Sequence, residues 1–98
     1  MLKNLVVYLI YADDCKDCED MRATIYDAIN NSSYGKEHCK LEEINSETDR
    51  AVDMAVDNDI NDLPACVIGD YVFCGKESYT YDSIFKALEK TFENDSKR

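Results

Sequence analysis

The sequence has 98 residues, which is enough for one small domain with a single hydrophobic core. Its hydrophobic content of 45% is typical of folded proteins, and its formal net charge is −10 at pH 7. A chain this acidic lacks the basic face that binds a nucleic-acid backbone or an anionic membrane surface, so we expect neither partner.

An apolar run extends from Leu5 to Ala12. It is similar to the centre of a signal peptide, but one lysine precedes it, no small-x-small cleavage pattern follows it, and two aspartates end it. The run is also too short to span a bilayer. Short apolar runs rich in Val, Ile, Tyr and Leu are typical of buried parallel strands, so we predict a strand here and a cytoplasmic protein.

A helical pattern follows this strand. Apolar residues recur at three- and four-residue steps, on what would be one face of a helix: Cys18, Met21, Ile25, Ala28 and Ile29. We expect Asp14 to cap the N-terminus of this helix and the polar segment 30–35 to end it. Residues 39–44, CKLEEI, then predict a short second strand.

Segment 45–60 predicts a modest second helix. Ser46 and Asp49 have the spacing of a capping box, which satisfies free backbone groups at a helix start. Three apolar residues about a turn apart are expected to face inward: Val52, Ala55 and Val56.

Two β-rich runs then flank Gly69-Asp70, a pair typical of a two-residue hairpin turn with glycine first. A last helix carries an apolar stripe made of Ile84, Phe85, Leu88 and Phe92. We expect a single domain over residues 1–93 and a polar tail over 94–98.

The predicted order is therefore strand, helix, strand, helix, two hairpin strands and helix. Parallel strands joined by a helical crossover imply an α/β sheet with helices on both faces. The loop between the first strand and the first helix lies at the carboxyl end of such a sheet, where α/β proteins place their chemistry. This loop and the first helical turn hold the CKDC motif, residues 15–18.

Two closely spaced cysteines at a helix start are suited to disulfide exchange. Free backbone N–H groups and the helix dipole stabilise a thiolate there, which favours Cys15 as the nucleophile. Cys18 lies one turn further along and is placed to resolve a mixed disulfide. Two inert core thiols are an alternative interpretation.

A zinc site is a second alternative, but structural zinc usually takes two close-spaced ligand pairs. The predicted hairpin pairs Cys66 with Phe73 and Cys74 with Ala65, so the two cysteines point to opposite faces of the sheet. They therefore cannot form a second ligand pair together. We expect Cys39, Cys66 and Cys74 to serve as small core residues.

The CKDC motif after the first strand, together with Leu63-Pro64 just ahead of the hairpin, resembles the thioredoxin superfamily, and its small glutaredoxin-like members most. The likeness covers roughly residues 3–92. It implies a thioredoxin-like fold with a central four-stranded mixed sheet and a cis Leu63-Pro64 peptide bordering the disulfide. Gly75 corresponds to the second glycine of the Gly-Gly pair in glutaredoxins.

The sequence also departs from this family. Leu9 stands where thioredoxins carry a buried aspartate, and Ala12 stands where glutaredoxins often carry a lysine that helps to bind glutathione. Leu63 replaces the more usual Thr or Val before the proline, and CKDC replaces CGPC or CPYC. Because of these differences, the resemblance does not predict the redox potential or the use of glutathione.

The resemblance implies a thiol–disulfide oxidoreductase that needs no metal or cofactor. We expect protein or small-molecule disulfides as substrates, an upstream reductase and a monomeric state. The predicted substrate-binding residues are Tyr11, Lys16, Leu63, Pro64 and Gly75. The competing hypotheses are a thioredoxin-fold interaction module without redox catalysis and a metal- or Fe–S-binding protein.

Overall fold

The computed structural model describes residues 5–32 and 35–96. The elements are β1 (Leu5–Tyr11), α1 (Lys16–Asn31), α2 (Gly35–His38), β2 (Cys39–Asn45), α3 (Asp49–Asp57), β3 (Ala65–Ile68), β4 (Tyr71–Cys74) and α4 (Tyr81–Ser96). The predicted order is confirmed, with one addition. The sequence pattern did not predict α2, which is a single short turn directly before β2.

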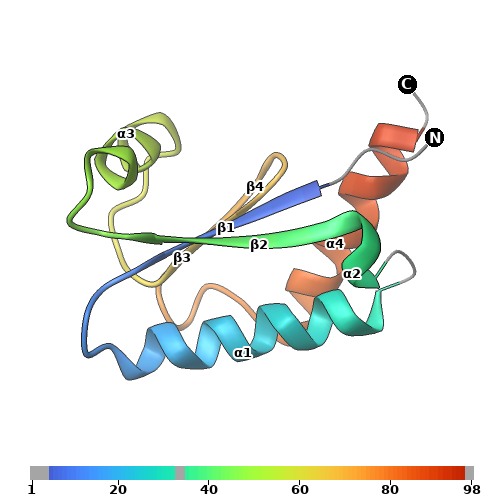
Figure 1. Cartoon of the computed structure of the whole chain (residues 1–98), viewed down its shortest axis with the longest axis horizontal. Coiled ribbons are helices and arrows are strands. Elements are labelled where there is room, and N and C mark those ends of the chain that lie inside the picture. The colour runs from blue at the N-terminus through green and yellow to red at the C-terminus, as the bar shows by residue number, and fades with distance from the viewer. Residues whose placement is uncertain (1–4, 33–34, 97–98) are drawn as a thin grey trace.

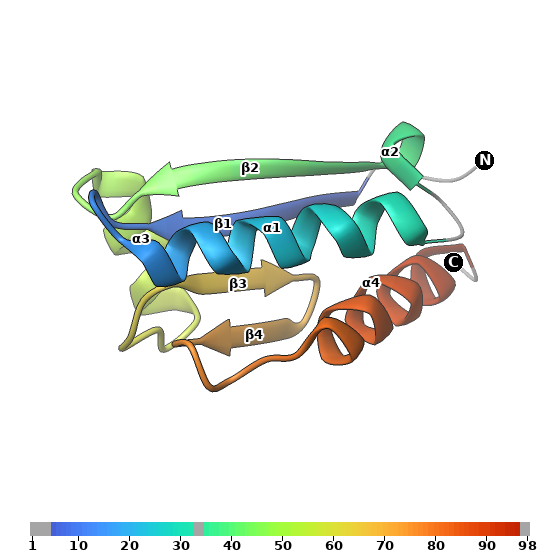
Figure 2. The ribbon, with the colours of Figure 1, turned by 90° about the horizontal axis from the view of Figure 1, so that it is seen from below.

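The four strands form one mixed sheet in the order β2-β1-β3-β4. Strand β1 runs parallel to β2 and antiparallel to β3, and β3 runs antiparallel to β4. Helices α1 and α4 cover one face of the sheet, and α3 covers the other (Figures 1 and 2). The predicted α/β class and the helices on both faces are therefore confirmed.

The core consists of two parts separated by the sheet. Side chains alternate along β1, so Val7 and Leu9 pack toward α1 and α4, while Ile10 packs toward α3. The larger part lies under α1 and α4, where all five predicted core residues of α1 are buried. The smaller part contains Ile10, Ile44, Ala51 and Ala65.

Helix α4 confirms the last predicted stripe. Ile84, Leu88 and Phe92 are buried, and Phe85 packs against them half-buried. The helix continues to Ser96, three residues into the segment expected to be a polar tail. Residues 97 and 98 lie outside the described part of the chain. No helix within that part is long and apolar enough to cross a membrane.

Helix α3 differs from the prediction in its start and in its inward face. The residue that caps it is Thr48, whose Oγ1 accepts a hydrogen bond from the Ala51 N–H at 3.2 Å, and not Ser46. Ala51 is buried, whereas Val52 and Val56 are exposed, so the predicted inward face was wrong. The turn after β2 accounts for this, because the Asn45 carbonyl accepts from the Thr48 backbone N–H at 3.1 Å and fixes how the chain enters the helix.

The β3–β4 hairpin has the predicted turn and register. Gly69 adopts the left-handed conformation, with φ +56°, which glycine reaches without the strain that a Cβ would cause. Ala65 pairs with Cys74, and Cys66 pairs with Phe73. Cys66 packs in the larger part of the core and Ala65 in the smaller, so Cys66 and Cys74 lie on opposite faces as predicted.

Candidate functional site

The two cysteines of the CKDC motif are joined by a disulfide at the start of α1, with their Cα atoms 5.2 Å apart. The residue that caps the helix is Cys15, whose Sγ accepts a hydrogen bond from the Cys18 N–H at 3.1 Å. The predicted cap, Asp14, is therefore wrong. Asp14 instead occupies the turn before the helix, with φ +53°, a conformation that Asp tolerates better than most residues.

The two sulfur atoms have different surroundings. Cys15 is half-buried, whereas Cys18 is only 4% exposed on the inward face of α1. The Cys18 Sγ accepts from the Ala12 N–H at 3.5 Å, and the Cys15 Sγ accepts from the Cys18 N–H in the first helical turn. Of the two residues, Cys15 is therefore the more exposed to another molecule.

A cavity of about 290 Å³ opens beside the disulfide. Its lining includes Leu9, Tyr11, Ala12, Asp13, Asp14, Cys15, Cys18, Glu19, Arg22 and Glu43. Four of these side chains are carboxylates and one is a guanidinium, and the guanidinium of Arg22 lies 3.4 Å from the Glu43 carboxylate. The cavity therefore has a strongly negative lining, and its single cation is already paired.

The Leu63-Pro64 peptide is cis, as the resemblance implied. Pro64 is buried directly before β3, and its carbonyl accepts a hydrogen bond at 2.8 Å from the N–H of Gly75, which directly follows β4. Lys76, which follows Gly75, places its Nζ 4.0 Å from the Oδ1 of Asp17 in the first turn of α1. The segment after β4 is thus linked both to the cis proline and to the helix that carries the disulfide.

The predicted substrate-binding residues fall into separate places. Tyr11 lines the same cavity as both cysteines. Lys16 is exposed on the first turn of α1, and Gly75 is held against Pro64. Leu63 lines a different groove, beside α3.

Asp62, which precedes the cis dipeptide, was not predicted from the sequence. Its Oδ1 accepts a hydrogen bond from the Leu63 N–H at 2.9 Å. Its Oδ2 lies only 2.5 Å from the position that a Cβ on Gly75 would take. The sequence does show an acidic residue next to Leu63-Pro64. It does not show that this residue lies close to Gly75, because the fold brings the two together.

Replacing Gly75 with alanine is expected to lower the free energy of unfolding by about 1–3 kcal/mol. Gly75 has φ +88°, which is strained for any residue with a Cβ, and the new methyl group would also displace the Asp62 carboxylate. We expect the loss to be about 0.5–1 kcal/mol smaller in an Asp62→Ala background, because the displaced group is then absent. Urea unfolding of the four proteins of this cycle measures the difference, and equal losses in both backgrounds would show that the contact is unimportant.

The other cysteines differ in their surroundings. Cys39 and Cys66 are buried and Cys74 is half-buried, and all three are free thiols. Burial raises the pKa of the Cys39 thiol to about 11. Burial also raises the pKa of the Cys66 thiol. Both of these thiols are therefore protonated and shielded near neutral pH.

Alkylation of the reduced protein with iodoacetamide at about pH 8 is expected to label Cys15 first and to spare Cys39 and Cys66. A free cysteine with a pKa of about 8.5 is roughly a quarter thiolate at that pH, whereas a thiol with a pKa near 11 is about 0.1% thiolate. Peptide mass spectrometry against time gives the order of labelling. All five cysteines should react in denaturant, and early labelling of Cys18 in the folded protein would reverse the assigned roles.

Within residues 5–32 and 35–96, no group of three or more His, Cys, Asp or Glu side chains is placed to hold a metal ion. The described residues therefore contain no set of ligands for the zinc site considered above. Cys15 and Cys18 are instead bonded to each other.

No protein-family model matches the sequence, and no curated protein matches it either. Several solved structures are similar in shape. An uncharacterised thioredoxin-like protein from Clostridium perfringens superposes with a TM-score of 0.69 at 18% identity, over 93% of this chain and 73% of that one. Mitochondrial thioredoxin 3 from Saccharomyces cerevisiae, in its oxidised form, gives 0.57 at 20% identity, over 94% of this chain and 79% of that one.

HBP35 of Porphyromonas gingivalis gives a TM-score of 0.72 at 18% identity, over 97% of this chain but only 34% of that larger one. At these identities the likeness establishes the fold. The protein has a thioredoxin-like fold with a CxxC pair at the start of its first helix.

Proposed function

We propose that the protein is a thiol–disulfide oxidoreductase that uses the Cys15–Cys18 couple. The observation that carries this proposal is the disulfide at the N-terminus of α1, which joins a half-buried Cys15 to a buried Cys18. Backbone N–H groups at a helix start stabilise a thiolate, which is the reactive form.

In the reduced protein, the Cys15 thiolate attacks one sulfur of a substrate disulfide. The substrate S–S bond breaks, a mixed disulfide forms, and the other substrate sulfur leaves as a thiolate. Cys18 then loses its proton and attacks the Cys15 Sγ, which releases the second substrate sulfur. The substrate gains two electrons and takes up two protons, and the protein ends as the disulfide that an upstream reductase must reduce again.

The direct test is the reduction of insulin disulfides with dithiothreitol as the electron source. Turbidity from the released insulin B chain should appear sooner with the protein than with dithiothreitol alone. A measured reduction potential of the Cys15–Cys18 couple then distinguishes a reductant from an oxidant, because a more negative value favours donation of electrons. An absence of any rate increase would favour a thioredoxin-fold module without redox catalysis.

Glutathione is expected to be a poor partner compared with a disulfide that lies next to basic residues. Reduced glutathione carries a net negative charge near pH 7, and the cavity beside the disulfide is lined by four carboxylates and a guanidinium already paired with Glu43. Ala12 also removes the cation that glutaredoxins commonly place near this site. Each close pair of exposed like charges costs about 1 kcal/mol in water. We therefore expect turnover with glutathione to be about two- to tenfold slower at low salt than with a disulfide next to basic residues.

Glutathione-coupled reduction of a small mixed disulfide, measured at low and high salt, tests this expectation. Slow turnover that improves with salt would support it. Fast turnover that does not change with salt would contradict it, and would make the protein a glutaredoxin in function.

The remaining expectations stay part of this proposal. Tyr11 would contact the substrate from the cavity beside the disulfide, and Lys16 from the adjacent turn of α1. The protein would act as a monomer in the cytoplasm on protein or small-molecule disulfides. Three of the five cysteines are free thiols, which supports a setting in which thiols stay reduced.

A further inference from the structure

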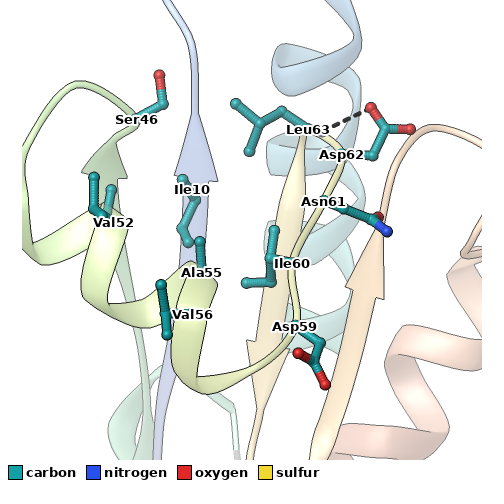
Figure 3. Close-up of a pocket in the computed structure, with 11 residues that line it drawn as sticks. Ile10, Ser46, Val52, Ala55, Val56, Asp59, Ile60, Asn61, Asp62 and Leu63 are labelled. Carbon is teal, nitrogen blue, oxygen red and sulfur yellow. Dashed lines mark hydrogen bonds between the residues drawn. The ribbon is translucent and has the colours of Figure 1, made fainter.

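A groove of about 1060 Å³ lies between α3 and the segment that follows it, on the sheet face opposite α1 (Figure 3). It shares no lining residue with the cavity beside the disulfide. Its apolar lining comes from three elements, with Ile10 on β1, Ala51 and Ala55 on α3, and Ile60 and Leu63 on the following segment. The groove is therefore a separate, mostly apolar surface.

Val52 and Val56 line the same groove and lie four residues apart, one turn of α3 from each other. They are 55% and 72% exposed, the highest values for large hydrophobic side chains in the described part of the chain. Figure 3 shows both side chains on the surface of α3 that adjoins the groove. Exposed apolar side chains grouped beside an apolar groove are typical of an interaction site.

The border of this groove is acidic. Asp59 and Asp62 line it, and Asp49, Asp53 and Asp57 are exposed along α3. The one cation of α3, Arg50, forms an ion pair with Glu42 and lies over the Tyr8 ring at 5.6 Å from its centre. Its charge is thus directed to the β2 side and does not neutralise the groove.

We propose that this groove binds a segment of another protein that presents apolar side chains on one face and Lys or Arg residues beside them. The apolar face would cover Val52 and Val56, and the cations would meet the aspartates at the border. A second copy of this chain is a poor occupant, because each copy carries a net charge of −10 and would oppose like charges. An anionic lipid surface is repelled for the same reason. The proposal needs no sulfur chemistry and does not rest on the proposed oxidoreductase function, although Leu63, one of the predicted substrate-binding residues, also lines this groove.

The probe is a fluorescent amphipathic helical peptide with leucines on one face and lysines on the other, titrated into the 98-residue chain and followed by anisotropy. One matched peptide carries glutamates in place of the lysines, and another carries serines in place of the leucines. We expect the first peptide to bind most tightly at low salt. Amide NMR shifts should localise its binding to α3 and segment 59–63.

Two pairs of variants give the decisive comparison. Val52→Ser with Val56→Ser is expected to weaken binding about tenfold, whereas Tyr26→Ser, an exposed apolar residue of α1, is not. Asp59→Asn with Asp62→Asn should weaken binding about three- to tenfold at low salt and little at about 0.5 M salt. The matched control replaces two exposed acids of α1 and α4, Asp27→Asn with Asp82→Asn, and should have a smaller effect.

Equal losses in the test and control variants, or NMR shifts confined to the cavity beside the disulfide, would overturn the proposal. A dimer that is detected by sedimentation and that dissociates in the Val56→Ser variant would also overturn the proposal, because the groove would then bind a second copy of the chain. If the protein binds phosphatidylserine vesicles and Val56→Ser abolishes that binding, the groove would belong to a lipid surface. That result would also overturn the proposal.

Discussion

Replacing Cys15 with serine is expected to lower the protein-catalysed rate of insulin reduction by about a hundredfold or more, so that the observed rate returns to that of dithiothreitol alone. A serine hydroxyl is not ionised near neutral pH and cannot form a disulfide. Cys15 is the accessible member of the pair, whereas Cys18 is buried behind it. Without the Cys15 thiolate, no sulfur of the pair is placed to meet a substrate.

The companion variant, Cys18→Ser, should lose turnover in a different way. Its Cys15 still attacks a substrate disulfide, but no neighbouring thiol resolves the product, so a mixed disulfide should accumulate. Mass spectrometry of the protein after reaction with a model disulfide measures the adduct and its site. Cys74→Ser serves as the control, because that half-buried thiol lies outside the disulfide and its loss should leave turnover nearly unchanged. Equal turnover in Cys15→Ser and the unmodified protein would contradict the proposed chemistry.

Replacing Ile25 with alanine is expected to lower the free energy of unfolding by about 2–5 kcal/mol. Ile25 is fully buried on the inward face of α1, within the larger part of the core. Removing three carbons leaves a cavity between α1 and the sheet, and the greater helix propensity of alanine offsets only a few tenths of a kcal/mol. For a domain of this size, the midpoint of thermal unfolding should fall by about 10 °C or more.

Two controls make the test of Ile25 specific. Ile25→Val removes one methylene group and should cost about 0.5–1.5 kcal/mol. Val56→Ala alters an exposed side chain of α3 and should change the stability by less than about 0.5 kcal/mol. Urea denaturation of the three variants gives the values, and a loss at Ile25 no larger than that at Val56 would contradict the packing of α1 described above.

The candidate site was only partly predictable from the sequence. The disulfide pair, its place at a helix start and the cis proline followed from the spacing of Cys15 and Cys18 and from the resemblance through Leu63-Pro64. The helix cap did not follow, because the left-handed turn at Asp14 moves that carboxylate away from the helix start and leaves the cap to the Cys15 sulfur. The role of Asp62 was also missed, since the residue that it approaches is 13 positions later in the chain.

Apart from the short helix α2, the sequence by itself determined the order of the elements, the inward face of α1 and the register of the hairpin. These features depend on local causes: a strong apolar period from Cys18 to Ile29, and a Gly69-Asp70 turn that aligns the strands on either side of it. The tertiary structure alone decided which face of α3 meets the sheet. That helix has few large apolar side chains, so its rotation was set by its entry turn at Asn45 and by the packing of Ala51 on the sheet, which left Val52 and Val56 outside.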